Sequence, residues 1–345
     1  MTSDSQRGAG RRSALDFGVA PLQLRRFMAQ RLRRAADILK HGAQRLARAD
    51  PESFDVNAVL DEYVVSMPSA QNALSALPGW NQALPPEFGV TGGYGAFYAD
   101  GRIAWAMEQA GGLEGKKVLE LGPLEASHTY MLEQGNPAVL CAIEANKLAF
   151  LRCLVVKEVL DLKIARFLLG NFMEWLENTP ERYDLIVASG VLYHMQDPLR
   201  LLELIAARTD SFYLWTHYVS QEAMPDEDPR RGAFVGEAEL HECHGVKVRL
   251  YKRSYMGAWK SKSFCGGAHD LHRWIEKDDL LALIRALGFS DISIAHDEPA
   301  HLYGPSFSVF ASRERDEVEP LRVAVPEPSD IDSLISDSGG TAAAA

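Results

Sequence analysis

The stretch Lys117–Leu121 (KVLEL), followed by Gly122-Pro-Leu-Glu-Ala-Ser-His128, decides the fold of this chain. KVLEL is a short apolar run that follows turn-like glycines, so it predicts a buried β-strand. Gly122 permits a tight turn and a close approach of the backbone to a ligand. A helix-capable stretch follows at 127–134. A strand that ends in a glycine turn and leads into a helix is the first unit of an α/β fold.

The same alternation of strand and helix continues along the chain. Further strands are predicted at 139–143 (VLCAI), 165–169, 183–189 (YDLIVAS) and 211–216 (SFYLWT), and helices at 146–160 and 198–207. Apolar strands separated by helices predict a parallel sheet that is covered on both faces. Near the end, a helix at 278–287 closed by Gly288 precedes two alternating strands, 291–295 and 306–311.

Composition excludes several classes of protein. The 345 residues are 47% hydrophobic and 24% charged, with a formal net charge of −11. That balance excludes a globally basic nucleic-acid coat, and four cysteines are too few for a disulfide scaffold of this size. No apolar run is long enough for a transmembrane segment, and the N-terminus lacks the apolar core of a signal peptide. We therefore expect a soluble, cytoplasmic protein.

Both ends of the chain differ in composition from the middle. We predict disorder at 1–20, a helical N-terminal extension at 21–91, a main domain at 92–312 and a disordered acidic tail at 313–345. Residues 1–48 hold eleven Arg or Lys against three Asp, and 22–48 has the apolar period of an amphipathic helix with an Arg-rich face. That face is either solvated or contacts an anionic membrane, a phosphate-bearing substrate or a partner.

The ends of the first three strands suggest a nucleotide-like cofactor. In open α/β sheets, ligands bind at the carboxyl ends of the strands. The second strand ends in Glu144, 24 residues after Glu120, and an acid there is placed to accept hydrogen bonds from two ribose hydroxyls. The third strand ends in Gly170-Asn171-Phe172. The Asn171 amide is placed to meet an adenine edge and Phe172 to pack on the ring.

These segments resemble the class I S-adenosylmethionine-dependent methyltransferases over roughly 92–312. The similar motifs are VLELG (118–122), AIEAN (142–146), LGNF (169–172), YDLIVASGVLYHMQDP (183–198) and ALGFSDISI (286–294). The resemblance implies an α/β, Rossmann-like, seven-stranded methyltransferase sheet of order 3-2-1-4-5-7-6. GVLYHMQDP is similar both to small-molecule methyltransferases and to tRNA wobble-uridine carboxymethyltransferases.

The resemblance also implies roles for single residues, with S-adenosyl-L-methionine as the cofactor. Glu120 would hold its ammonium group, the backbone around Gly122 its carboxylate and ribose, and Glu144 the ribose hydroxyls. The remaining cofactor-binding positions would be Asn171 and Phe172 at the adenine and Ser189 and Gly190 beside the reacting centre, with Tyr193 and His194 behind them.

The first loop departs from the family in one respect. The family usually has three glycines at alternate positions, whereas this chain has Gly122 followed by Leu124 and Ala126. The larger side chains narrow the approach to the methionine portion of the cofactor.

An alcohol acceptor must lose a proton during methyl transfer, which calls for a general base. His194 is the first candidate and His217 the second, because histidine titrates near neutral pH. For each, the alternative is a structural histidine that only satisfies hydrogen bonds.

Two segments are candidates for the acceptor pocket. Residues 92–102 combine glycines and aromatics, which is typical of a mobile loop over a ligand or of a connecting loop packed on the domain. Residues 217–275 form an insertion before the last helix, with an alternating strand at 246–251. Its aromatic and basic residues either bind a sugar, phosphate or nucleotide or form a solvated lid: Tyr255, Trp259, Lys260, Lys262 and Phe264.

The insertion also contains six potential metal ligands: His241, Cys243, His244, Cys265, His269 and His272. Their spacings match none of the usual paired patterns, so we predict no metal site.

The sequence therefore predicts methyl transfer to a small-molecule or glycan-type acceptor, most readily to a hydroxyl oxygen. One alternative is a tRNA-modifying (carboxy)methyltransferase, in which 22–48 contacts RNA, although the net charge of −11 does not favour a nucleic-acid partner. The other is a non-catalytic methyltransferase-fold scaffold, which the glycine-poor first loop supports. The sequence carries no signal for an oligomeric state.

Overall fold

The computed structural model describes residues 63–261 and 263–313, and the chain divides into two units, Met1–Pro68 and Ser69–Ala345. The main sheet and its helices belong to the second unit. The predicted disorder at 1–20, the basic helix at 22–48 and the acidic tail beyond 313 lie outside the described residues. Among the helices of the described part, none has the length and apolar character needed to cross a membrane.

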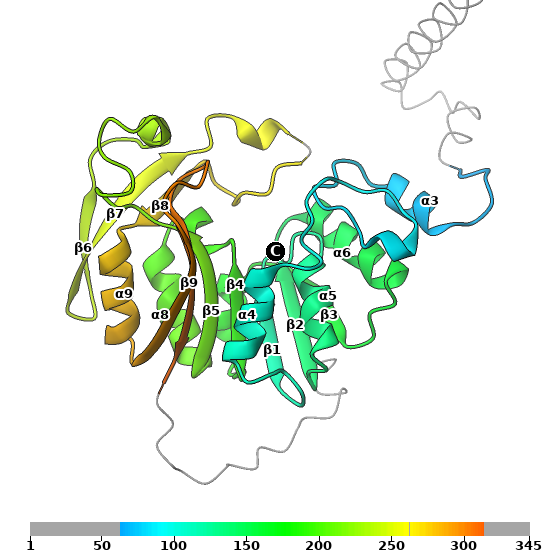
Figure 1. The fold of residues 1–345 in the computed structure, drawn as a ribbon, viewed down its shortest axis with the longest axis horizontal. Coiled ribbons are helices and arrows are strands. Elements are labelled where there is room, and N and C mark those ends of the chain that lie inside the picture. The colour runs from blue at the N-terminus through cyan, green and yellow to red at the C-terminus, as the bar shows by residue number, and fades with distance from the viewer. Residues whose placement is uncertain (1–62, 262, 314–345) are drawn as a thin grey trace, which may run out of the picture. The chain divides into compact units, whose positions relative to one another are not determined.

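A seven-stranded sheet forms the centre of this unit (Figure 1). Its order is β3-β2-β1-β4-β5-β10-β9, which confirms the predicted order 3-2-1-4-5-7-6. Strands β1 to β5 run parallel, and β10 is antiparallel to both of its neighbours. The strands are β1 (Lys117–Leu121), β2 (Val139–Glu144), β3 (Ala165–Leu169), β4 (Leu185–Ser189), β5 (Ser211–His217), β9 (Asp291–Glu298) and β10 (Ser306–Ser312).

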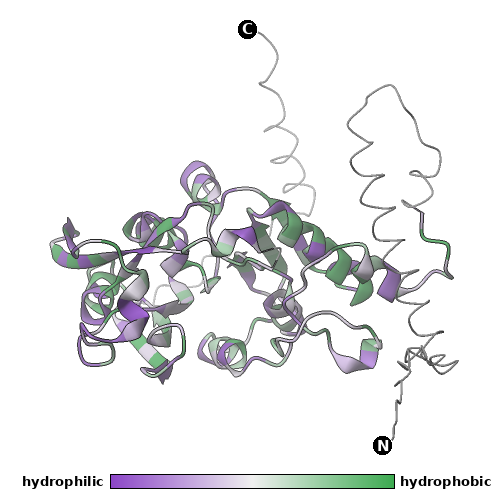
Figure 2. Ribbon diagram, turned by 90° about the horizontal axis from the view of Figure 1, so that it is seen from above, coloured by the Kyte–Doolittle hydropathy of each residue, from purple (hydrophilic) through white to green (hydrophobic). Residues whose placement is uncertain are grey.

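Helices cover both faces of this sheet. They are α4 (Gly101–Gln109), α5 (Ser127–Gln134), α6 (Lys147–Val159), α7 (Phe172–Asn178), α8 (Pro198–Arg208) and α9 (Lys277–Ala286). Along β4, Leu185 and Val187 pack with residues of α4, α5 and α6, and Ile186 packs with α7, α8 and α9 on the other face. The helices that cover the sheet carry both hydrophilic and hydrophobic residues (Figure 2), and the clusters on the two faces of the sheet consist of hydrophobic ones. Burying one such side chain contributes about 1.5–3 kcal/mol.

Two of the helices begin at residues of the sequence motifs. The Asn146 side chain accepts hydrogen bonds from the backbone N–H groups of Leu148 and Ala149 and so caps α6. Asp197 caps α8, and Pro198 occupies the first helical position, where its missing N–H costs nothing. Each cap fixes where the chain leaves the carboxyl end of a strand, and the site residues lie at those turns.

The insertion folds as a second, three-stranded antiparallel sheet beside the first (Figure 1). Its strands are β6 (Glu239–Cys243), β7 (Val246–Ser254) and β8 (Leu271–Ile275). His244 and Gly245 both have positive φ, as a two-residue hairpin of this type requires. Val248 and Leu250 join the apolar cluster of α8 and α9, so the insertion is packed onto the main sheet.

The segment ahead of the main sheet contains α3 (Ala70–Ser75) and the short 3₁₀ helix η1 (Pro86–Phe88). Its glycine-rich stretch lies directly on residues 81–83. Gly93 donates to the Gln82 carbonyl, and a Cβ at Gly93 would lie 2.2 Å from the Asn81 carbonyl carbon. These glycines therefore serve a close approach of two backbones, which is the packed-loop alternative for 92–102.

Candidate cofactor and acceptor site

The loop after β1 has a left-handed backbone at three alternate positions, although only the first of them is a glycine. Gly122, Leu124 and Ala126 have φ of 67°, 55° and 60°, all in the left-handed region. For a residue with a Cβ this conformation costs about 1–2 kcal/mol. The side chains of Leu124 and Ala126 therefore add strain to this loop. Strain of this kind is often held at functional sites.

Glu144 at the end of β2 holds this loop in place. Its carboxylate accepts a hydrogen bond from the backbone N–H of Leu124 at 3.1 Å and from that of Asn146 at 2.8 Å. The Gly122 N–H donates to the Ile143 carbonyl at 2.9 Å. Burial raises the pKa of Glu144, and the backbone donors oppose that shift. A carboxylate offers about four acceptor sites, so capacity remains for a donor from a ligand.

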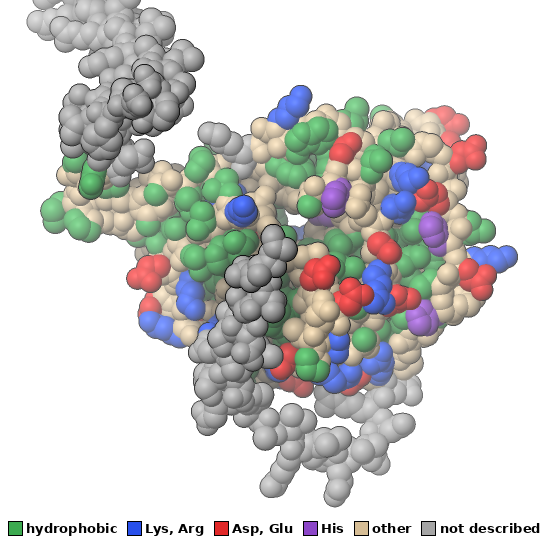
Figure 3. All heavy atoms as spheres, turned by 180° about the vertical axis from the view of Figure 1, so that it is seen from behind, with side chains coloured by type: hydrophobic (Ala, Val, Ile, Leu, Met, Phe, Trp, Pro, Cys, Tyr) green, Lys and Arg blue, Asp and Glu red, His purple; other side chains and the backbone are tan. Residues whose placement is uncertain are grey.

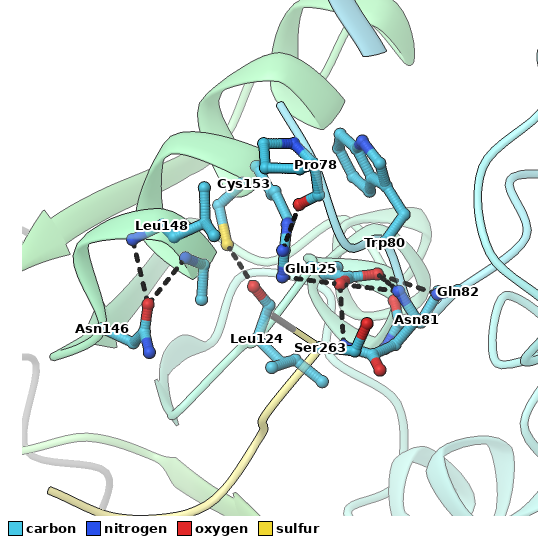
Figure 4. Close-up of polar contacts among 12 residues, drawn as sticks. Pro78, Trp80, Asn81, Gln82, Leu124, Glu125, Asn146, Leu148, Cys153 and Ser263 are labelled. Atoms are coloured by element: carbon cyan, nitrogen blue, oxygen red, sulfur yellow. Dashed lines mark hydrogen bonds and ion pairs between the residues drawn. The ribbon is translucent and has the colours of Figure 1, made fainter. Parts of the chain in front are cut away.

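A second acid, Glu125, joins the loop to the segment ahead of the domain (Figure 4). Its fully buried carboxylate accepts from the backbone N–H groups of Asn81 and Gln82 at 2.8–3.0 Å. It also accepts from Nη1 of Arg152 at 3.1 Å, and Arg152 donates in addition to the Pro78 carbonyl. The sequence reasoning missed this acid, because its partners are distant in the chain.

The tip of the insertion comes to the same place. Figure 4 shows Ser263 beside the Asn81 side chain and near Leu124. Burial, with the Glu125 charge nearby, raises the pKa of Cys265, which agrees with this placement. The insertion therefore reaches from the β5 side of the sheet across to the loop after β1.

Glu120 is buried inside β1. Thr129 Oγ1 donates to its carboxylate at 2.5 Å, and burial raises the pKa of Glu120 to about 8. At neutral pH the group is therefore mainly a neutral acid. A cation brought beside it would favour the carboxylate form.

The residues after β3 are less accessible to a ligand than the sequence suggests. The Asn171 side-chain oxygen accepts from the Met173 N–H at 3.0 Å and so caps α7. Its amide N–H₂ is the part that remains for a ligand. Phe172 is 9% exposed and packs in the apolar cluster with α8.

Ser189 is the last residue of β4, and Gly190 follows it beside the aromatic side chains of Tyr193 and Trp215. The Gly190 N–H donates to the Trp215 carbonyl at 2.9 Å. A Cβ at Gly190, where φ is 81°, would lie 3.7 Å from Tyr193 Oη and 3.8 Å from the Trp215 ring. The turn after β4 continues into the 3₁₀ helix η2 (Leu192–His194), which carries Tyr193 and His194.

Both predicted histidines lie against Tyr193. The ring centroids of His194 and His217 are 4.1 Å and 4.6 Å from that of Tyr193. The His217 ring also stacks on Trp274 of β8, with centroids 4.8 Å apart and planes 5° from parallel. Residues from β4, β5 and the insertion therefore meet at the carboxyl edge of the sheet.

His217 is held in one tautomer. Its Nδ1–H donates to the carbonyls of Gly304 and Pro305 at 2.9 Å and 3.2 Å, so Nε2 carries the lone pair. No described residue donates a hydrogen bond to Nε2. Burial, with His301 nearby, lowers the pKa of His217 to about 4. The ring is therefore neutral at neutral pH, and Nε2 is a hydrogen-bond acceptor.

His194 has the opposite arrangement. The Tyr255 hydroxyl accepts from the Gly267 N–H at 2.7 Å and lies 2.6 Å from Nδ1 of His194. We assign the tyrosine O–H as the donor to Nδ1, which leaves the His194 proton on Nε2. Burial holds the pKa of His194 well below its usual value. Nε2 of His194 is thus a hydrogen-bond donor, whereas Nε2 of His217 is an acceptor.

Sequence reasoning missed two cationic residues of this region. Arg102 of α4 lies over the Trp215 ring, 4.5 Å from its centroid, and is paired with Asp100 at 2.6 Å. Arg253 of β7 lies 4.7 Å from the centroid of the Trp274 ring. An Asp100 N-cap just before α4 was a readable signal for that helix. Nothing local indicates that Arg253 faces β5.

Of the six potential metal ligands, only Cys243 and His244 come together. Glu203 of α8 joins them: its Oε1 lies 3.5 Å from Cys243 Sγ and 3.2 Å from His244 Nε2. Within 63–261 and 263–313 this is the one group of three ligand-type side chains close enough to share an ion. His272 lies instead in the aromatic group, stacked on Tyr255.

No family model and no curated protein matches this chain. Solved structures do. The N-terminal domain of EvdMO1 with SAH bound has a TM-score of 0.53 and 19% identity, over 77% of this chain and 100% of that one. The same domain in the presence of SAH and D-fucose has a TM-score of 0.52 and 21% identity, over 71% and 95%. Together with the strand order, this likeness shows the class I S-adenosylmethionine-dependent methyltransferase fold.

Proposed function

We propose that this chain transfers a methyl group from S-adenosyl-L-methionine to a hydroxyl of a small-molecule or glycan-type acceptor. The observation that carries the proposal is His217. Its Nδ1–H is committed to two backbone carbonyls, and its Nε2 is unprotonated at the carboxyl end of β5. Glu144 and the left-handed loop lie at the carboxyl ends of β2 and β1, in the same sheet edge.

The residues of that edge fit the proposed cofactor. The Glu144 carboxylate accepts two hydrogen bonds from backbone N–H groups and would accept further ones from the ribose hydroxyls of the cofactor. The backbone at Gly122 would contact the carboxylate of the cofactor's methionine portion. Glu120 would ionise to hold the ammonium group. Asn171 and Phe172 would contact the adenine of the cofactor. Ser189 and Gly190 would lie beside its methyl group. When bound, the cofactor supplies an electrophilic methyl group on a sulfonium.

The chain's own residues then provide alignment and a base. Holding the acceptor hydroxyl in line with the methyl group supplies most of the acceleration. Nε2 of His217 takes the hydroxyl proton as the oxygen attacks. The Gly304 and Pro305 carbonyls stabilise the imidazolium through Nδ1–H. Nε2–H of His194 is available to orient a second acceptor oxygen.

The surroundings favour a sugar-like acceptor. Tyr193, Trp215 and Trp274 surround His217 with ring faces and edges, and such walls with few polar groups are typical of small-molecule sites. The similar EvdMO1 domain was crystallised in the presence of D-fucose. On the face in Figure 3, acidic and basic side chains are interleaved. Among the described side chains of that face, no basic stripe of the kind that a tRNA substrate would favour is visible.

Calorimetric binding of SAM and SAH to the full chain tests the proposal. Wild type should bind both, and Glu144→Ala should weaken SAH binding by at least about 100-fold, because two hydrogen bonds to a charged group contribute about 1.5–3 kcal/mol each. Glu108→Ala, at an exposed carboxylate of α4, is the matched control and should bind normally. A folded wild type that binds neither compound would favour the scaffold alternative.

A further inference from the structure

Three buried polar atoms without hydrogen-bond partners gather on one face of the insertion. They are Nε of Arg253, Nε2 of His272 and Nε1 of Trp274. His272 and Trp274 are 1% and 2% exposed. Leaving a buried polar group unsatisfied costs about 1–3 kcal/mol, and native structures rarely concentrate such groups. Three of them in one place indicate a ligand that completes their hydrogen bonds.

The three side chains are neighbours and face the site. Arg253 and His272 are directly opposite each other in the β7–β8 pairing, and Trp274 is two residues from His272 on the same strand face. The Arg253 guanidinium lies 4.7 Å from the centroid of the Trp274 ring, which stacks on His217. The charge of Arg253 also acts on His194, His217 and Tyr193. This cation therefore lies beside the proposed base.

Arg253 differs from the other arginines of the same small sheet. Arg249 pairs with Asp279 at 2.8 Å, and Arg273 pairs with Glu239 at 2.9 Å. Within the described residues, no carboxylate lies within ion-pair distance of the Arg253 guanidinium, and that side chain donates no hydrogen bond. A partly desolvated charge without a partner is costly, and buried charges are normally paired. A negative group on a ligand would supply the missing partner.

The hydrogen-bonding types narrow the ligand further. Arg253 and Trp274 offer N–H donors. His272 donates from Nδ1 to the Asp270 carbonyl at 3.0 Å, so its Nε2 is an acceptor. Nε2 of His217 is a second acceptor. The site therefore offers two donors, one of which is cationic, and two acceptors. A molecule that carries both a negative group and hydroxyl groups matches this set.

We propose that the acceptor is a hydroxylated anion, such as a sugar acid or a sugar phosphate, whose carboxylate or phosphate binds Arg253 and Trp274. Hydroxyls of the same molecule donate to Nε2 of His272 and of His217, and the latter is the hydroxyl that is methylated. This inference rests on the proposed function and names its substrate class. Arg253 acts in it as a specificity-determining residue.

Titration calorimetry with the full chain tests the proposal, in the presence and absence of saturating SAH. The probes are D-glucuronate, D-glucose 6-phosphate and neutral D-glucose. At least one anion should bind about tenfold or more tightly than glucose, because charge-assisted hydrogen bonds are about twice as strong as neutral ones. The better anion distinguishes a carboxylate site from a phosphate site.

Variants separate a specific site from general attraction of anions. Arg253→Gln should remove the preference for the anion, and Arg253→Lys should retain part of it. Lys247→Gln removes an exposed positive charge from the same strand and should leave the preference intact. Equal affinity of wild type for glucose and both anions would overturn the proposal. So would a preference that persists in Arg253→Gln or is lost in Lys247→Gln.

Thermal melting gives a readout that a structural arginine would not produce. The better anion should raise the melting temperature of wild type and not that of Arg253→Gln. Without ligand, Arg253→Gln should melt no lower than wild type, because the substitution removes an unpaired charge. A lowered melting temperature together with no anion effect on wild type would make Arg253 structural. If wild type binds the anion but not SAH, the proposed function is overturned and the anion site stands. The titrations without SAH therefore show whether the anion site exists in either case.

Discussion

Arg152 and Glu125 form an ion pair of 3.1 Å whose side chains are 2% and 0% exposed. The pair links α6 to the loop that follows β1. The same carboxylate accepts backbone hydrogen bonds from Asn81 and Gln82. One buried acid therefore fixes both the loop after β1 and the segment that precedes the domain.

Breaking this pair should strongly destabilise the protein. Arg152→Met leaves the Glu125 charge buried without its partner, and such changes cost about 3–5 kcal/mol. Urea denaturation measures the free energy of unfolding. The double variant Arg152→Met/Glu125→Gln should lose less than the sum of the single changes, because no unpaired charge remains. Asp161→Asn, which breaks the exposed pair with Lys163, is the control and should have no measurable effect. Equal losses in the buried and exposed pairs would contradict this account.

Gly122→Ala should destabilise more than Gly111→Ala. The two glycines have nearly equal φ, 67° and 66°, so each substitution brings about 1–2 kcal/mol of left-handed strain. Only at Gly122 would the new Cβ meet a neighbour, Val191 Cγ1 at 2.7 Å; at Gly111 nothing lies within 4 Å. The clash should add about 1–3 kcal/mol. Denaturation curves that show the same loss for both variants would refute the role assigned to Val191.

His217→Gln should lower kcat by about 10²–10⁴ with an accepted hydroxyl substrate, because the proposed base is lost. Its SAH affinity should stay at the wild-type level, which calorimetry measures. His194→Gln should keep most of the activity, since a glutamine side chain both accepts from Tyr255 and donates. The reverse order of the two variants would make His194 the base.

Glu120 should make the protein less stable as pH rises. Its pKa of about 8 in the folded protein lies above the ordinary value of 4.5, so the native state binds more protons than the unfolded state between these pH values. The free energy of unfolding should therefore fall across that window, by an amount on the order of 3–5 kcal/mol at 1.36 kcal/mol per pKa unit. Below about pH 4.5 the contribution is fully present.

Glu120→Gln should abolish this decline, because the amide mimics the neutral acid at every pH. The measurement is urea denaturation at about pH 5 and about pH 8. Glu108→Gln, at an exposed position, should keep the wild-type slope. A Glu120→Gln protein with an undiminished slope would show that other groups cause it.

The sequence predicted the strands of the main sheet closely. β3 matches the predicted 165–169, and β2, β4, β5 and β10 differ by one or two residues at their ends. Apolar strands buried on both faces leave a continuous signal, which is why these elements were visible. It did not predict α4, α7, β6 or β8. The seven residues of α7 and the five of β8 are too short for a period to appear, and β6 is largely exposed.

The sequence by itself determined the strands of the main sheet and the positions of Glu120 within β1 and of Glu144 and His217 at strand ends, because each depends on local hydrophobic pattern. The order of the sheet followed from the resemblance of its motifs to the methyltransferase family. Only the tertiary structure decided that Leu124 and Ala126 adopt the left-handed conformation, since Glu144 and Glu125 hold that loop through distant hydrogen bonds. It also decided that Arg253 lies unpaired beside Trp274. That arrangement depends on how the small sheet packs against the large one, and the residues involved share no local pattern.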